Sequence, residues 1–354
     1  MTTNVLKKGL NAELKTAAYF QARGYLVRRG VTLSVSSGTK EATDIDLLGI
    51  RFGTFLDEER LVVDCKDRKK PRPFERVLWT LGVSSFSEAT KSVVVLPKAP
   101  WQAREFASRK GIKILETRKL DELLKTVGNT FPFFSDANQK FTLKLDSLIK
   151  SLSELDKELL REDLKLKQML IVGHPITNLN RIIDIISKSG KFISGASDSV
   201  SQFKRCLCYN AAIIASIMLV RFAAESIWTP KVDWSDYARK KLTYGDVSPE
   251  KARKLAKLAY SQDFHKGLPE PEYMDEIIEL IKDLISKPEM TALIPFFLDF
   301  RLFGSILGEI PEKTTCPLIE EKQEELNKIG KRILSTLSFA AKIDSNLWDC
   351  EKKL

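Results

Sequence analysis

The runs TDIDLLGI (43–50) and RLVVDCKD (60–67) are short, apolar and rich in Leu, Ile and Val, and we predict that they form neighbouring β-strands. The polar segment RFGTFLDEER (51–60) joins them and contains Gly53, which favours a turn. The sequence therefore places these two strands side by side in one sheet.

The alternation of side chains along the second run decides which of its polar groups share a face of the strand. Side chains two positions apart on a strand point to the same face, so Asp64 and Lys66 point together. The intervening Cys65 points the other way, in the row of Leu61 and Val63 that faces the core. An acid and an amine are thus expected on one face of the sheet.

The carboxylates within these apolar strands need a compensating partner. A charged group there costs desolvation free energy, and a divalent cation between Asp46 and Asp64 would offset that cost. Hard oxygen ligands favour Mg²⁺ or Mn²⁺. Asp44 shares the strand face of Asp46 and is a competing ligand, but we favour Asp46 because the apolar strand follows it directly. Two acids and a lysine arranged in this way predict a metal-dependent site that cuts phosphodiester bonds.

These residues resemble the PD-(D/E)XK, or restriction endonuclease-like, nuclease superfamily. Asp46 stands at the first acidic position of that family, and Asp64 and Lys66 stand at its (D/E)XK motif. Glu13, in GLNAELKTAAYF (9–20), resembles the acid of its first helix, although an ordinary solvated helix residue is the alternative. The family more often has Glu where this chain has Asp64, and no Pro precedes Asp46.

The stretch SVVVLPKAPWQAREFASRKGIKILETRKLDELL (92–124) resembles the end of the Mrr-like branch of that superfamily, with strand, helix, short strand and final helix. The resemblance covers residues 1–128 and no more. It implies an α/β domain with a central mixed sheet flanked by helices. A restriction or defence role is suggested only by this analogy of fold.

The resemblance also implies an activity, namely a Mg²⁺- or Mn²⁺-dependent DNA endonuclease that leaves 5′-phosphates. Asp46, Asp64, the Cys65 backbone carbonyl and Glu13 would hold the metal. Lys66 would orient the attacking water or stabilise negative charge in the transition state.

The distribution of charge favours a nucleic-acid partner for the same part of the chain. Residues 1–128 hold 24 Lys and Arg against 15 Asp and Glu, whereas the remainder is almost balanced, with 33 against 32. Cationic side chains that displace counterions supply most sequence-independent affinity for DNA. Arg28 and Arg29 are expected to end the first helical region, and a second cluster follows the D-x-K strand. The candidate DNA contacts are Arg28, Arg29, Arg68, Lys69, Lys70 and Arg72.

The cysteines and histidines exclude several rival chemistries. The five cysteines are scattered apart from Cys206 and Cys208, which lack a second pair at zinc spacing and are expected in a buried helix. With His174 and His265 as the only histidines, a histidine-based nuclease is not expected. This cysteine usage, without a secretory signal pattern, favours a reducing cytoplasm.

The second part of the chain, 140–354, is predicted to be all-helical and to follow a linker at 129–139. A stripe of apolar residues between Phe141 and Leu159 suggests one amphipathic helix that packs within the domain. The uncharged run 206–220 is shorter than a membrane span and is expected to be the central helix, so no membrane partner is predicted. Further helices are expected at 176–189, 203–228, 248–262, 271–286, 289–307 and 318–345.

Other functions stay open at this stage. The principal alternative is a catalytically silent nuclease-like module that binds nucleic acid or assembles with a partner. In either case the helical part would provide recognition, a homodimer contact or a protein-binding surface. An RNA-directed nuclease ranks last because the chain has no usual RNA-recognition motif.

Overall fold

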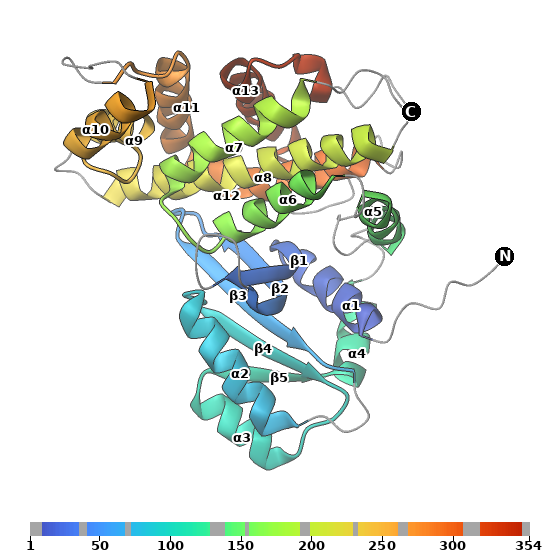
Figure 1. Ribbon diagram of the computed structural model, residues 1–354. Coiled ribbons are helices and arrows are strands. Elements are labelled where there is room, and N and C mark those ends of the chain that lie inside the picture. Colours follow the sequence, from blue (N-terminus) through green and yellow to red (C-terminus); the bar gives the residue numbers. More distant parts are fainter. Residues whose placement is uncertain are drawn as a thin grey trace.

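The computed structural model describes residues 9–34, 41–67, 72–127, 139–152, 156–191, 199–228, 233–260, 268–306 and 319–348. Its first part alternates helices and strands, and its second part is helical (Figure 1). The elements of the first part are α1 (Leu10–Gln21), β1 (Leu26–Ser34), β2 (Glu41–Phe52), β3 (Glu58–Cys65), α2 (Pro73–Phe86), β4 (Lys91–Leu96), α3 (Trp101–Arg109), β5 (Ile112–Glu116) and α4 (Thr117–Val127).

The strands form one mixed sheet in the order β1-β2-β3-β4-β5. The pairs β1–β2 and β2–β3 are antiparallel, and the pairs β3–β4 and β4–β5 are parallel. A tight turn joins β2 to β3, in which the Gly53 amide donates to the Asp57 carbonyl at 2.9 Å. The predicted order of an α/β part with a mixed sheet and then a helical part is confirmed at this level.

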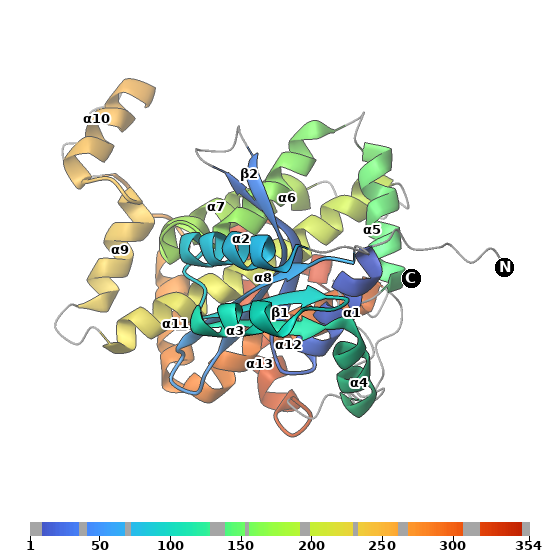
Figure 2. The same ribbon diagram turned by 90° about the horizontal axis from the view of Figure 1, so that it is seen from below.

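Helices cover both faces of the sheet. The odd-numbered residues Val63, Cys65, Val93 and Val95 form one apolar cluster with α1 and α4. On the opposite face, a second cluster joins β4 and β5 to α2 and α3, and both views show these two helices side by side (Figures 1 and 2). The alternation predicted for Leu61, Val63 and Cys65 is therefore confirmed.

The second part consists of helices packed around one long central helix, α8 (Ser199–Trp228). The other helices are α5 (Gln139–Leu152), α6 (Lys157–Met169), α7 (Pro175–Gly190), α9 (Trp234–Tyr244), α10 (Pro249–Tyr260), α11 (Met274–Ser286), α12 (Pro288–Ile306) and α13 (Gln323–Ala341). Cys206 and Cys208 are buried in α8, as expected. Cys316, Cys350 and His265 lie outside the described residues.

Two expectations for helix boundaries were wrong. The single stripe from Phe141 to Leu159 is divided between α5 and α6, and the Asp156 carboxylate caps the second helix by accepting from the Leu159 amide at 3.2 Å. An acidic cap favours a new helix start over continuation, because it satisfies an otherwise unpaired amide. Arg28 and Arg29 lie in β1 rather than at the end of a helix, since α1 ends at Gln21.

Within the described ranges, Ser199–Ile227 is one helix long and apolar enough to cross a membrane, and 94% of its most apolar window is buried inside the molecule. The burial is of the kind found in the core helix of a globular protein.

The helical part and the sheet share one continuous apolar core. Leu48, Ile50 and Val62 of the sheet pack in the same cluster as Leu166 of α6 and Phe300 of α12. Figure 1 shows the helical layer lying across the β1–β3 side of the sheet. The division into domains at 128 and 140 stays a prediction.

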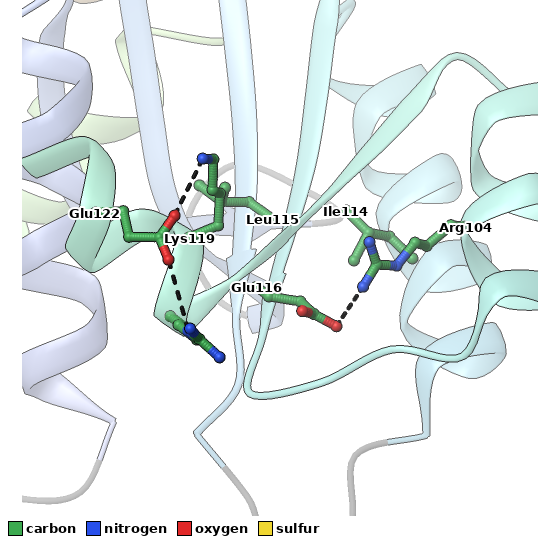
Figure 3. Close-up of a pocket in the computed structure, with 7 residues that line it drawn as sticks. Arg104, Ile114, Leu115, Glu116, Lys119 and Glu122 are labelled. Atoms are coloured by element: carbon green, nitrogen blue, oxygen red, sulfur yellow. Dashed lines mark hydrogen bonds and ion pairs between the residues drawn. The ribbon is translucent and has the colours of Figure 1, made fainter.

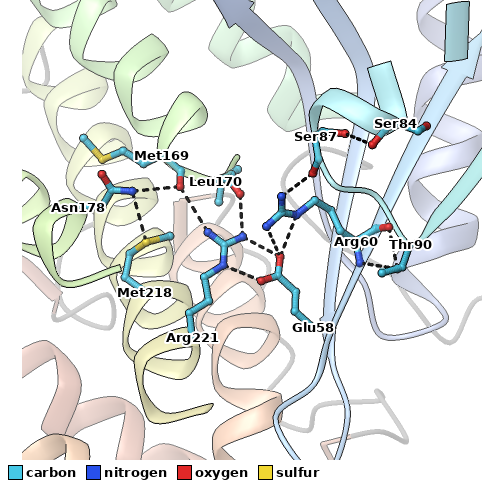
Figure 4. A network of polar contacts seen from close by, with 10 residues as sticks. All are labelled: Glu58, Arg60, Ser84, Ser87, Thr90, Met169, Leu170, Asn178, Met218 and Arg221. Carbon is cyan, nitrogen blue, oxygen red and sulfur yellow. Dashed lines mark hydrogen bonds and ion pairs between the residues drawn. The ribbon is translucent and has the colours of Figure 1, made fainter. Parts of the chain in front are cut away.

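A polar network also joins the two parts (Figure 4). Glu58, at the start of β3, accepts from Arg221 of α8 at 2.7 Å on each carboxylate oxygen, and from Arg60 at 3.1 Å. Arg221 also donates to the Leu170 carbonyl at 2.7 Å. The two arginines hold the pKa of Glu58 below its usual range, against the opposing effect of burial.

We expect Glu58→Gln to destabilise the protein by about 1–3 kcal/mol, because charge-assisted hydrogen bonds at a half-buried interface are replaced by neutral ones. Urea unfolding at neutral pH measures the change. A matched variant, Glu105→Gln, removes the charge of an exposed helix residue that pairs with Arg109 and should change the free energy of unfolding by no more than about 0.5 kcal/mol. Equal effects of the two variants would contradict the role assigned to this network.

Candidate active site

Asp46 and Asp64 lie where the antiparallel pairing of β2 and β3 stops. The last paired residues are Leu47 and Val63, and beyond them the Cys65 amide donates to the Asp46 carboxylate at 2.7 Å. Lys66 follows β3 directly and donates from its Nζ to Asp46 Oδ2 at 2.8 Å. Its Nζ also lies 3.1 Å from Asp64 Oδ1. The structure therefore brings together the two acids and the lysine that the sequence singled out.

Cys65 faces away from these charged groups, as predicted. Its Sγ lies 3.7 Å from Thr16 Oγ1 of α1, and burial raises the pKa of the thiol well above its usual value. A buried neutral thiol is a core residue and not a nucleophile. The competing acid, Asp44, is exposed and opposite Thr32 of β1.

Glu13 of α1 lies beside the site and is not an isolated solvated residue. Its carboxylate accepts from Arg29 Nε at 3.3 Å and Nη2 at 3.2 Å. Burial raises its pKa, the Arg29 charge lowers it, and the Asp46 charge raises it further, so the two carboxylates are electrostatically close. Burial likewise raises the pKa of Asp46, against hydrogen bonding from Lys66.

Arg76 of α2 is a site residue that the sequence analysis missed. Its Nε donates to Asp64 Oδ2 at 2.7 Å, and its Nη2 contacts Asp64 Oδ1. Its guanidinium also lies over the Trp79 ring, 4.5 Å from the ring centroid. Asp64 is 0% exposed, and each of its two oxygens contacts a nitrogen of the Arg76 guanidinium. Arg76 lies outside the D-x-K motif, and it reaches Asp64 because the helix α2 follows β3 and packs against the sheet.

The site is electrically balanced by its own side chains. Three carboxylates, Glu13, Asp46 and Asp64, lie next to three cationic side chains, Arg29, Lys66 and Arg76. In the described part of the chain, no group of three or more His, Cys, Asp and Glu side chains is arranged to hold a metal ion. The oxygen donors nevertheless are of the kind that Mg²⁺ prefers. Among the described residues, the hydrogen bonds to the Asp46 carboxylate are made at Oδ2 and leave Oδ1 for another ligand.

We expect the pKa of Glu13 to appear in the stability of the metal-free protein. Its folded pKa is above the ordinary value, so its contribution is fully present below the unfolded pKa and is lost as pH rises through the folded pKa. Thermal melts in EDTA from about pH 4 to about pH 7 should show wild type losing stability relative to Glu13→Gln as pH rises. A stability difference that is constant with pH, or that grows in favour of wild type, would contradict the raised pKa.

The candidate DNA contacts fall into different environments. Arg28 is buried and pairs with Asp299 of α12 at 2.9 Å, so its assignment as a surface DNA contact is corrected: it joins the sheet to the helical part. Arg29 is engaged with Glu13. Arg72, just before α2, is 83% exposed. Arg68, Lys69 and Lys70 lie outside the described residues.

A pocket of about 460 Å³ lies at the end of β5, apart from the two acids and lysine (Figure 3). Its charged lining is already paired, Arg104 with Glu116 and Lys119 with Glu122. Such mutual neutralisation leaves little to recognise a charged ligand, and the pocket is not the candidate site.

His174 has a structural environment. Its Nδ1 accepts from the Ile176 amide at 3.3 Å at the start of α7, and its Nε2 lies 2.9 Å from the Tyr237 hydroxyl. Burial lowers its pKa, which favours the neutral ring. These contacts tie α7 to α9.

Comparisons of the chain with protein-family models, with curated proteins and with solved structures found no match.

Proposed function

We propose that this protein is a metal-dependent DNA endonuclease with a restriction endonuclease-like N-terminal part. The observation that carries the proposal is the meeting of Asp46, Asp64 and Lys66 at the point where β2 and β3 separate. An acid on one strand and D-x-K on the next is the arrangement that the PD-(D/E)XK resemblance implies.

The arrangement of the sheet supports the same proposal. Helix α1 precedes an antiparallel meander, β1-β2-β3, and the helix α2 then leads to a parallel strand, β4. In this order Glu13 of α1 interacts electrostatically with Asp46, and Arg76 of α2 donates to Asp64. Two helices, α1 and α2, therefore bring charged groups to the ends of β2 and β3.

Asp46 and Asp64, with Glu13 and the Cys65 carbonyl, would hold Mg²⁺ or Mn²⁺. A cation bound there would polarise a phosphate oxygen and lower the pKa of a water molecule. Lys66 stays protonated, since its hydrogen bond to Asp46 and the charge of Asp64 raise its pKa against the opposing effect of burial. Its ammonium is then placed to stabilise negative charge that develops on the phosphate.

DNA is the proposed substrate because the excess positive charge lies in the part that carries these acids. Exposed Arg72 follows the D-x-K strand and would contact the phosphate backbone, together with Arg68, Lys69 and Lys70. A role in restriction, defence or DNA processing, a cytoplasmic location, and a homodimer or protein partner at the helical part belong to this proposal as well.

The test is incubation of purified protein with duplex, single-stranded, branched and methylated DNA in Mg²⁺, Mn²⁺ or EDTA. Cleavage in metal that is absent in EDTA, with 5′-phosphate ends, is the expected result. No cleavage of any of these substrates in either metal would rule out the enzyme.

One observation favours the second candidate, a silent nucleic-acid-binding module: Asp64 is fully buried beneath Arg76 and Lys66. A module of that kind would bind DNA without metal and would keep its affinity after Asp64→Asn. An enzyme would show metal-dependent turnover that the same variant removes. DNA-binding and cleavage assays on one preparation therefore separate the two candidates.

A further inference from the structure

Arg76 occupies the carboxylate that the proposed metal requires. Two of its nitrogens contact the two oxygens of Asp64, and Asp64 has no exposed surface through which another ligand reaches it. The arginine side chain itself is 19% exposed and rests on the Trp79 ring. It therefore has solvent on one side and the carboxylate on the other.

A cation and Arg76 compete for the same oxygens. Two positive groups on one buried carboxylate repel each other, so metal binding at Asp64 needs the guanidinium to leave. A guanidinium that leaves a carboxylate is most stable against another planar or tetrahedral oxyanion, and the phosphate of a nucleic acid is one. Arg72, four residues earlier, shows that the start of α2 reaches solvent.

We propose that Arg76 is an intrinsic competitor of the metal that moves from Asp64 to a substrate phosphate, so that DNA and metal bind cooperatively. In the free protein, Arg76 is bound to Asp64 and excludes the metal from that carboxylate. When DNA supplies a phosphate, Arg76 has an alternative partner and the carboxylate becomes available. The inference deepens the proposed function and rests on it.

This coupling is reciprocal by thermodynamic necessity: DNA raises the affinity for metal by the factor by which metal raises the affinity for DNA. Couplings of this kind are about 5- to 150-fold. The proposal also explains how the site is charge-balanced without a metal, because Arg76 supplies the positive charge that the metal would bring.

The experiment is a Mn²⁺ titration followed by the electron paramagnetic resonance of the free ion, with and without a short phosphorothioate duplex that resists hydrolysis. In wild type, the duplex should raise Mn²⁺ affinity by at least about 5-fold. Without DNA, Arg76→Ala should bind Mn²⁺ at least about 5-fold more tightly than wild type. The duplex should then raise the Mn²⁺ affinity of this variant only slightly. Arg109→Ala is the matched control: this exposed arginine of α3 pairs with Glu105, and its variant should keep the metal affinity and the coupling of wild type.

Arg76→Lys provides a second variant in case Arg76→Ala folds poorly, because it keeps the positive charge and loses the two-point contact. Its metal affinity should lie between those of wild type and Arg76→Ala, and Mn²⁺ should raise the Tm of both variants more than that of wild type. Wild-type affinity and coupling in both variants would overturn the inference and leave the nuclease proposal standing. Absence of Mn²⁺ binding in every protein, with and without DNA, would remove the proposed function as well.

Discussion

Replacement of Lys66 by Ala is expected to abolish DNA cleavage, with a loss of at least about 100-fold in turnover. The amine is the only side-chain group in the described structure that contacts both Asp46 and Asp64, at 2.8 Å and 3.1 Å. Its removal takes away the ammonium that is proposed to stabilise negative charge on the phosphate. The fold should survive, because Asp64 keeps Arg76 and Asp46 keeps the Cys65 amide.

The measurement compares initial cleavage rates of wild type and Lys66→Ala in saturating Mg²⁺ or Mn²⁺, with circular dichroism to confirm folding. Lys15→Ala is the matched control: this lysine also belongs to the N-terminal part, but pairs with Asp121 of α4 at 2.7 Å. It should retain nearly all activity. A folded Lys66→Ala protein that cleaves at the wild-type rate would refute the assigned role.

The second large effect is expected at the contact between the sheet and the helical part. Asp299→Ala should destabilise the protein by about 3–5 kcal/mol, because it leaves the Arg28 charge buried without its carboxylate. Arg28 and Asp299 are 3% and 0% exposed, and Arg28 Nη2 lies 2.9 Å from Asp299 Oδ1. Arg28 Nε also donates to the Asn210 side chain of α8 at 3.1 Å.

Urea unfolding of Asp299→Ala and of the double variant Arg28→Met/Asp299→Leu measures this effect. The double variant removes both charges and should recover most of the stability, since an apolar pair of similar volume often replaces a buried ion pair at little cost. An Asp299→Ala protein as stable as wild type would show that the pair does not join the two parts. If the double variant is no more stable than Asp299→Ala, the loss of stability comes from altered packing and not from the unpaired Arg28 charge.

Several strands of the sheet, and the positions of the two acids on them, could be predicted because a strand has a local sequence pattern. Alternation alone separated Asp64 and Lys66 from Cys65, and the apolar run after Asp46 distinguished it from exposed Asp44. The long apolar run in α8 also indicated a buried central helix. These features depend on residues that are close in sequence. The relative directions of such side chains are set by the period of the strand or helix.

The pairings that the sequence did not show depend on tertiary contacts. The arginines that neutralise Glu13 and Asp64 come from β1 and α2, and neither spacing nor composition shows which carboxylate each will meet. Arg28 was assigned to DNA contact because of its charge, yet its partner Asp299 lies far away in the sequence. A buried ion pair of this kind becomes visible only when both elements are placed.

The central claim is that Asp46 and Asp64 hold a catalytic metal when substrate is present. A crystal structure of the protein with a phosphorothioate duplex and Mn²⁺, with anomalous scattering to locate the ion, tests it most directly. We expect a Mn²⁺ peak about 2 Å from oxygens of Asp46 and Asp64, with Arg76 turned to a phosphate. DNA bound with no Mn²⁺ at these acids, and with Arg76 still paired to Asp64, would contradict it.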